Sequence, residues 1–208
     1  MPYRNRVTPS GEIVATPERG TLMGNRGVIH ADDGAHKREW QVRRWIACRL
    51  EFKGRRRAVR QPRRWTELFF LDEATALAAG HRPCAECRRE DYRRWQAAWP
   101  GEDAHADAMD LVLHADRLDG RAKRTYDARL GELPDGVMVE RRGAAFLVAG
   151  GGLHGRRHRP RLRGLRAPVG FLTSATRPGG RYPVRSEVIA DTAPTPGLRA
   201  SERRWSEK

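Results

Sequence analysis

Residues 69–88 read FFLDEATALAAGHRPCAECR, and this stretch decides the fold that we expect for the first half of the chain. The apolar run before Asp72, over residues 65–71, predicts a short strand. Asp72 is a good N-cap for a helix over residues 73–79, and Gly80 supplies the stop after it. The stretch therefore predicts a strand, a capped helix and a loop, in that order.

Cys84 and Cys87 form a C-x-x-C pair at the start of a second predicted helix, over residues 87–99. Two thiolates at this spacing can bind one tetrahedral zinc ion, and a helix N-terminus favours the anionic form of a thiol. A thioredoxin-like redox pair is the rival interpretation, but such a pair follows a strand in a βαβ unit, and none is expected here. With only three cysteines and no export signal, reduced thiols that bind a metal are the better expectation.

The same stretch resembles the zinc-binding domain of the Ada DNA-repair protein family. That family combines a Phe-Phe-Asp strand and an alanine-rich helix ending in Ala-Gly with the motif Arg-Pro-Cys-x-x-Cys-Arg, and residues 69–88 are similar to this order. Upstream, WIACR at 45–49 followed by GRR at 54–56 is similar to the segment around the family's first ligand cysteine. The resemblance covers about residues 25–90. It implies a Zn²⁺ site whose ligands include Cys48, Cys84 and Cys87.

The sequence departs from the family at one ligand position. The family's zinc is bound by four cysteines, the first two separated by three residues, but Phe52 stands where the second would follow Cys48. A structural zinc ion is almost always four-coordinate, so we expect a histidine to complete the site. His30 is the first choice, because the short apolar run before it reads as a strand that ends in a ligand. His81 and His36 are the alternatives.

The resemblance implies DNA binding by basic residues beside the zinc site, and transfer of a methyl group from a DNA phosphotriester to Cys48. A zinc-bound thiolate is a nucleophile held in its deprotonated form. Replacing one thiolate by a neutral histidine lowers the negative charge of the site and weakens its nucleophilicity. We therefore expect a mainly structural zinc ion in a DNA-binding protein connected with repair or processing of modified DNA. Methyl acceptance on Cys48 stays an alternative.

Positive charge is concentrated in two parts of the chain. Lys and Arg number 41 against 26 Asp and Glu, which gives a formal net charge of +15. A GC-rich genome would raise the arginine content everywhere, whereas clustering favours contact with phosphate backbones. The candidate nucleic-acid contacts are Arg49, Lys53, Arg55, Arg56, Arg57, Arg60, Arg63 and Arg64 in a first tract, and Arg156 and Arg157 in a second. The expected partner is a nucleic acid, with DNA favoured over RNA.

The fold class expected from these elements is α+β. Residues 1–100 are predicted to form a small zinc-stapled domain, which includes a strand over residues 40–53. Residues 101–190 are predicted to hold a helix and then a smaller β-rich, barrel-like part, because apolar runs flank an Arg-Gly turn at residues 142–143. Residues 191–208, which contain prolines and end in charge, are predicted to be a disordered tail.

Two further functions stay open. A metal-dependent nuclease could use His114 and Asp116 on a third predicted helix, with phosphate contacts from residues 123–125, although no recognisable catalytic spacing joins them. An RNA-binding module would follow if the β-rich part is a small barrel. The sequence leaves open whether any reaction is catalysed and which oligomeric state the chain adopts.

Neither a secretory signal nor a membrane segment is visible in the sequence. The first residues, MPYRNRV, lack the apolar core of a signal peptide. No apolar run approaches the roughly 20 residues that a membrane helix needs. The expected compartment is the cytoplasm, and no membrane partner is expected.

Overall fold

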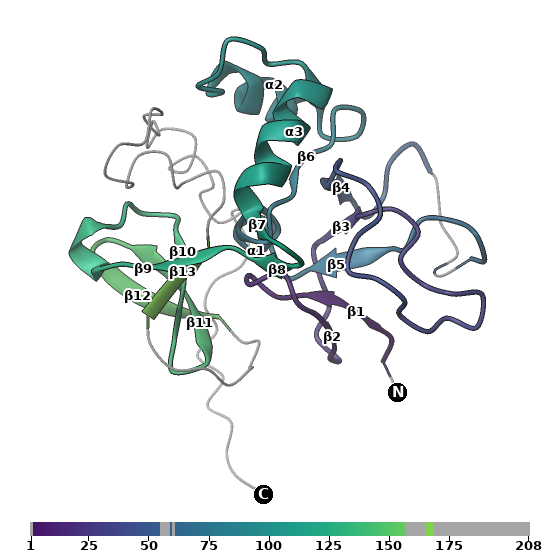
Figure 1. Ribbon diagram of the computed structural model, residues 1–208, viewed down its shortest axis with the longest axis horizontal. Coiled ribbons are helices and arrows are strands. Elements are labelled where there is room, and N and C mark those ends of the chain that lie inside the picture. Colours follow the sequence, from purple (N-terminus) through teal and green to yellow (C-terminus); the bar gives the residue numbers. More distant parts are fainter. Residues whose placement is uncertain (1, 55–58, 60, 157–164, 169–208) are drawn as a thin grey trace, which may run out of the picture.

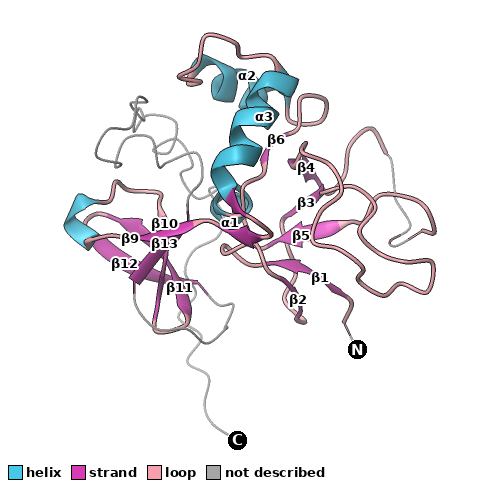
Figure 2. Ribbon diagram, viewed as in Figure 1, coloured by secondary structure: helices cyan, strands magenta, loops and turns pink. Residues whose placement is uncertain are grey.

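The computed structural model describes residues 2–54, 59, 61–156 and 165–168, and its fold is α+β (Figure 1). Most strands belong to two sheets, one from the first half of the chain and one from the second (Figure 2). In Figure 1 the first sheet lies on the right, the second lies on the left, and the helices occupy the top and centre. The expected fold class is confirmed at this level.

The first sheet has six short strands in the order β2-β1-β5-β3-β4-β6. Its strands are β1 (Arg4–Val7), β2 (Ile13–Ala15), β3 (Leu22–Asn25), β4 (Ile46–Arg49), β5 (Leu68–Phe70) and β6 (Arg82–Pro83). The β1–β5 and β4–β6 pairs are parallel, and the other neighbours are antiparallel. The β4–β6 pair matters most for function, because it aligns the segment around Cys48 with the segment before Cys84.

Helix α1 (Glu73–Ala78) packs against this sheet, as the residues around it predict. Asp72 caps it by accepting a hydrogen bond from the Thr75 N–H at 2.8 Å. Gly80 follows the helix with a φ of +87°. A residue with a side chain would be strained in this left-handed conformation, whereas glycine adopts it readily. The core between helix and sheet contains Val7, Ile13, Ile29, Ala47, Leu68, Phe70, Ala76 and Ala79.

Helices α2 (Arg89–Ala97) and α3 (Ala106–Arg117) pack on each other. Their contact is a cluster of buried aromatic and apolar side chains, Tyr92, Trp95, Met109 and Leu113. A buried ion pair ties α3 to the first sheet, because Arg82 in β6 donates to the two carboxylate oxygens of Asp110 at 2.9 and 2.7 Å. Both helices were predicted, and α2 is shorter than the predicted range at each end.

The second sheet has five strands in the order β12-β11-β10-β13-β9. They are β9 (Thr125–Asp127), β10 (Met138–Arg141), β11 (Ala144–Ala149), β12 (Gly152–Arg156) and β13 (Leu165–Pro168). The predicted hairpin is confirmed: β10 and β11 pair around Arg142 and Gly143, whose φ angles of 51° and 76° suit a tight hairpin turn. The barrel-like arrangement is not formed by the described strands, because β12 and β9 stay unpaired edges of an open sheet.

Short elements connect the two halves of the chain. They are the two-stranded hairpin of β7 (Leu118–Asp119) and β8 (Ala122–Lys123), and the 3₁₀ helix η1 (Leu130–Glu132). The hairpin directly follows α3. Arg117 is the last residue of that helix, and Lys123 is the last residue of β8.

Two strands expected from the sequence differ in the structure. Over residues 40–53 only β4 is a regular strand, because the Gln41 and Val42 N–H groups before it both donate to the Arg26 carbonyl, at 2.8 and 3.1 Å, which is not a strand ladder. The apolar run before His30 is not a sheet strand, because the Val28 and Ile29 N–H groups donate to the side chains of Gln41 and Thr66. In the second case, side chains satisfy the backbone groups that a neighbouring strand was expected to satisfy.

Some predictions fall outside the described residues. These are the tail at residues 191–208 and the candidate contacts Arg55, Arg56, Arg57, Arg60 and Arg157. Arg156 is described through its backbone alone, in β12. The domain boundaries near residues 100 and 190 stay predictions. Within the described chain, no helix has both the length and the apolar character to cross a membrane.

Candidate metal centre

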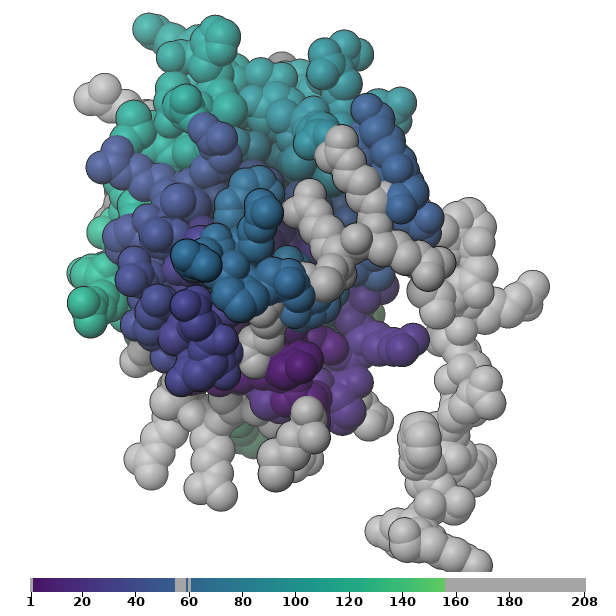
Figure 3. Space-filling model, turned by 90° about the vertical axis from the view of Figure 1, so that its right-hand side faces the viewer, coloured from purple at the N-terminus to yellow at the C-terminus, as the bar shows by residue number. Residues whose placement is uncertain are grey.

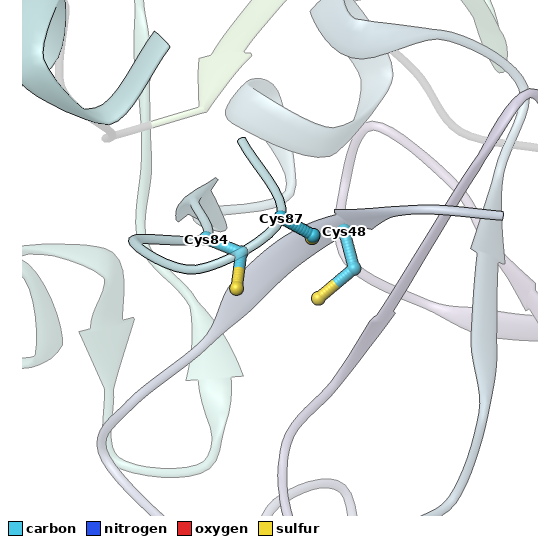
Figure 4. A group of neighbouring side chains, drawn as sticks. All are labelled: Cys48, Cys84 and Cys87. Atoms are coloured by element: carbon cyan, nitrogen blue, oxygen red, sulfur yellow. The ribbon is translucent and has the colours of Figure 1, made fainter. Parts of the chain in front are cut away.

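Strands β4 and β6 bring the three cysteines of the chain together (Figure 4). The strands pair in parallel, with Ala47 opposite Pro83. The pairing continues past the end of β6, where the Cys84 N–H donates to the Ala47 carbonyl at 3.0 Å. Cys48 and Cys84 are therefore on adjoining backbones, although they are distant in sequence.

A tight turn brings Cys87 back to the end of β4. The Arg88 N–H donates to the Cys84 carbonyl at 3.0 Å, and α2 begins at the next residue. The Arg49 N–H then donates to the Cys87 sulfur at 3.4 Å. The predicted position of the C-x-x-C pair at a loop-to-helix junction is confirmed, and the junction also contacts the strand of the third cysteine.

The sulfur atoms of Cys48, Cys84 and Cys87 all lie within 4.8 Å of one another. Three thiolates that bind one zinc ion at about 2.3 Å with tetrahedral angles are about 3.8 Å apart, so the cluster has the size that a shared ion requires. Cys84 and Cys87 are each 8% exposed, and Cys48 is the more accessible residue. The three side chains thus fit a metal ion with one coordination position left for another ligand.

The three sulfurs hold their protons with different strength. A hydrogen bond from Cys48, joined by the backbone N–H groups of Cys87 and Glu86, lowers the pKa of the Cys84 thiol to about 5 against the opposing effect of burial. The hydrogen bond to Cys84 and burial raise the pKa of the Cys48 thiol, and burial raises the pKa of the Cys87 thiol. The protein itself therefore stabilises one thiolate at neutral pH. A bound cation would displace the remaining protons.

Arg88 fixes the cysteine turn between two helices. Its guanidinium donates to the Glu73 carboxylate in α1 and, at 2.8 Å, to the Asp91 carboxylate in α2. Arg88 is only 5% exposed, so water has little access to its guanidinium group. Charge-assisted hydrogen bonds are screened less there than on the open surface. The turn is thereby held in one position by the fold and does not depend on a metal ion for its attachment.

His30, the first choice for a fourth ligand, does not join the sulfurs. Its ring nitrogens lie 2.6 Å from the Thr66 hydroxyl and 3.3 Å from the Gln61 carbonyl, so the buried imidazole is hydrogen-bonded elsewhere. Over the described residues, the group of metal-ligating side chains around Cys48 includes no histidine, aspartate or glutamate. The structure therefore brings together three of the four expected ligands and separates His30 from them.

The two alternative histidines also lie elsewhere. The buried ring of His81 packs against Trp45 and Phe70, with ring centroids 5.2 and 4.6 Å apart, and accepts a hydrogen bond from Arg26 at 3.3 Å. His36 makes an isolated backbone bridge to His30. The fourth position of the site is not filled by a histidine from the described part of the chain.

The first basic tract borders the metal centre through β4. Its described members are all exposed: Arg49, Lys53, Arg63 and Arg64. Arg49 directly follows Cys48, and Trp65 beside the tract is 52% exposed. The half-buried Phe52, four residues after Cys48, lies under Lys53, whose ammonium nitrogen is 5.2 Å from the ring centroid. Figure 3 shows this side of the molecule, where segments from the first half of the chain gather.

His114, the candidate nuclease residue, is packed among aromatic rings. Its ring centroid is 4.5 Å from that of Trp40 and 6.2 Å from that of Trp45, both in edge contact. Its Nδ1 accepts a hydrogen bond from Arg117 at 2.9 Å, and burial, together with the charges of Arg117 and Arg43, lowers its pKa. No group of three metal-ligating side chains forms around His114 in the described structure. These contacts fit a packing role.

Sequence reasoning missed two buried arginines, Arg26 and Arg117, each at most 2% exposed. The spacing of Met109, Leu113 and Arg117 was a usable signal, because residues four apart share one face of a helix and the first two are apolar. Arg26 has no comparable local signal. Its environment comes from segments that are distant in sequence.

Comparison with known proteins gives no match, since no family model, no curated protein and no solved structure matches the chain.

Proposed function

We propose that this chain is a zinc-containing DNA-binding protein, connected with repair or processing of modified DNA, in which the zinc ion is mainly structural. Cys48, Cys84 and Cys87 bind the ion, and residues 25–90 form an Ada-like zinc-binding domain. The observation that carries the proposal is the clustering of three sulfurs within 4.8 Å, supplied by a strand and by a turn that pairs with it.

The donor set favours zinc over the harder divalent ions. Thiolates are soft ligands, and sulfur-rich tetrahedral sites are typical of zinc and iron–sulfur centres, whereas magnesium and calcium require oxygen ligands. A water molecule or an external group supplies the fourth ligand in this proposal, because the described part of the chain offers no fourth side chain. The ion joins β4 to the start of α2, so that its loss removes the sulfur–metal bonds that reinforce the contact between the cysteine turn and the sheet.

The surface beside the site supports nucleic-acid binding. Exposed arginines and a lysine provide contacts to phosphates, and the exposed ring of Trp65 provides a surface on which a base can stack. The formal net charge of +15 adds a long-range attraction to a polyanion. The proximity of Arg49 to Cys48 means that a nucleic acid bound to this tract would pass close to the metal centre.

The salt dependence of DNA affinity tests the binding surface. We expect the dissociation constant for a short duplex to rise steeply with salt, with a slope that falls by about 2 in the variant Arg63→Gln/Arg64→Gln, because each lost phosphate contact changes the slope by about 0.9. The matched control is Arg129→Gln/Arg141→Gln, which removes two exposed charges from the second half of the chain. A flat salt response, or equal effects of the two variants, would contradict the proposed surface. RNA that competes as well as DNA would contradict the preference for DNA.

A second candidate function is methyl acceptance by Cys48, which the accessibility of this residue and the three-ligand site favour. Cys48 is more exposed than the other two cysteines, and reactive zinc sites keep one position open. In this reaction the Cys48 sulfur forms a bond to the methyl carbon of a DNA phosphotriester while the carbon–oxygen bond breaks. The phosphodiester leaves with the electron pair of that bond.

Mass spectrometry distinguishes the two candidates. After incubation with DNA that carries methyl phosphotriesters, methyl acceptance adds the mass of one CH₂ group to the peptide containing Cys48 and leaves the peptide containing Cys84 and Cys87 unchanged. An unmodified Cys48 peptide rules out the transfer and leaves the structural role of zinc in place.

A further inference from the structure

A cluster of cationic side chains is buried behind the metal centre, where β4 and β6 begin. The ring of Trp45, just before β4, contacts two guanidinium groups: that of Arg26 is 4.1 Å from the ring centroid and that of Arg117 is 3.9 Å from it. Arg26 is 2% exposed and Arg117 is 1% exposed. Two arginines are thus held on one aromatic ring inside the protein.

Lys123 brings a third cationic group into the same place. A Cβ atom added to Gly80 would lie 3.3 Å from the Lys123 ammonium nitrogen and 2.8 Å from Arg117 Cδ. A Cβ atom added to Gly11 would lie 3.9 Å from Lys123 Cδ and 3.6 Å from Arg26 Nη2. The Lys123 side chain therefore passes close to both arginines, beside two glycines at which a Cβ atom would contact it.

Each of the three residues keeps a buried nitrogen that has no hydrogen-bond partner. These atoms are Arg26 Nη2, Arg117 Nε and Lys123 Nζ. Other nitrogens of the same arginines are used: Arg117 Nη1 donates to the Gly80 carbonyl at 2.7 Å, and Arg26 Nε donates to His81 at 3.3 Å. Because a buried donor without an acceptor is costly, three of them in one cluster indicate an acceptor that binds there.

The charge of the cluster is not balanced by the acids near it. Asp110, whose charge reaches Arg117, is already bound by Arg82 through both carboxylate oxygens. Glu39, whose charge reaches Arg26, is exposed. Burial, with Arg117 and Arg26 adding to it, holds the pKa of Lys123 well below its usual range. The cluster thus presents donors and positive charge with no counter-ion from these acids.

We propose that Arg26, Arg117 and Lys123 form a binding site for a phosphate group. A phosphate offers several acceptor oxygens on one small dianion, which suits three donors from three directions, and guanidinium groups bind phosphate in charge-assisted hydrogen bonds. The Lys123 side chain is half-buried while its ammonium nitrogen is out of contact with solvent, so the group reaches the cluster along β8. The ligand is either free phosphate or the terminal phosphate of a nucleic acid. The site is separate from the metal centre and does not require the proposed DNA binding.

Titration of the full chain with inorganic phosphate tests this site. Binding is measured by calorimetry and by ³¹P NMR, and sodium chloride of equal ionic strength is the reference. We expect saturable binding at one site. The variant Lys123→Met, which keeps the length of the side chain but removes its charge, should weaken the affinity roughly tenfold or more. The matched control Lys37→Met, which removes an exposed lysine, should bind phosphate as the unmodified chain does.

Two oligonucleotides identical except for a 5′-phosphate or a 5′-hydroxyl identify the source of the phosphate. A preference for the phosphorylated strand that Lys123→Met abolishes assigns the site to a nucleic-acid end, and phosphate binding without that preference assigns it to free phosphate. Absence of saturable phosphate binding, or equal affinity of the unmodified chain and Lys123→Met, overturns the proposal. Phosphate binding by a chain that binds no DNA would refute the proposed function and leave this site intact.

Discussion

The metal centre and the buried cation cluster are built on the same two strands, yet they gather opposite kinds of side chain. Trp45 directly precedes β4, and Cys48 lies within it. His81 directly precedes β6, and Cys84 directly follows it. At one end of the strand pair, three sulfurs lie within 4.8 Å of one another; at the other, two arginines lie on one ring and a lysine lies close to both. A buried group of like side chains indicates its ligand by what it lacks, here a cation at one end and an anion at the other.

Removing one sulfur should have the largest effect. We expect Cys84→Ser to lose zinc and to lower the free energy of unfolding by about 4 kcal/mol, which is the contribution of an ion present at about 1,000 times its dissociation constant. For a chain of this size that corresponds to a fall in Tm of roughly 8–16 °C. A chelator should lower the Tm of the unmodified chain toward that of Cys84→Ser and leave the variant unchanged. A chelator-insensitive unmodified chain would contradict a structural metal.

Breaking the ion pair between the two sites should have the next largest effect. Asp110→Asn leaves Arg82 buried without its counter-charge, so we expect a loss of about 3 kcal/mol in the free energy of unfolding, measured with urea. The control is Asp107→Asn, which removes the exposed partner of Arg44 and should cost less than about 1 kcal/mol. Equal losses in the two variants would contradict the stabilising role of the buried Arg82–Asp110 ion pair.

Removing charge from the cation cluster should stabilise the protein when phosphate is absent. The ammonium group of Lys123 is buried beside Arg26 and Arg117, so Lys123→Met should raise the free energy of unfolding by about 2 kcal/mol in phosphate-free buffer. Saturating phosphate should narrow this difference by about 1.4 kcal/mol or more, because a tenfold loss of affinity in the variant corresponds to about that much stabilisation of the unmodified chain alone. If Lys123→Met is less stable than the unmodified chain in both buffers, the cluster has a structural role and is not an anion-binding site.

The smallest expected effect is on pH dependence. Burial and the charges of Arg26, Arg117 and Lys123 hold the pKa of His81 well below 6.5, so the folded ring stays neutral while the unfolded chain takes up a proton below that pH. Stability is therefore lost as pH falls below 6.5, by about 1.4 kcal/mol per pH unit from this group. His81→Gln keeps all three cysteines, so metal loss in acid contributes to both proteins alike. Parallel stability curves between pH 5 and 7 for the two proteins would refute this role of His81.

Local signals were sufficient for the elements that hold the metal centre. Asp72 and Gly80 determine where α1 begins and ends through their own backbone preferences, and the Arg142-Gly143 pair determines a hairpin turn in the same way. The C-x-x-C pair was visible from its spacing. Cys48 required the resemblance to the Ada family, because nothing in its own surroundings points to residues that follow it by more than thirty positions.

The parts that could not be predicted depend on contacts between distant segments. His30 is held by Thr66 and Gln61, and no pattern near His30 indicates that these side chains will meet it. Arg26 and Lys123 come close only because the end of β3, strand β8 and the loop at Gly11 lie together in the fold. The sequence therefore indicated which residues carry metal chemistry, but not which polar groups the fold would bury beside them.

The zinc content of the purified chain tests the central claim most directly. Elemental analysis, together with X-ray absorption at the zinc edge, should give about one zinc ion per chain bound by three sulfurs and one lighter atom, and Cys84→Ser should contain none. A purified chain without zinc, or a Cys84→Ser variant with the same zinc content, would contradict the account.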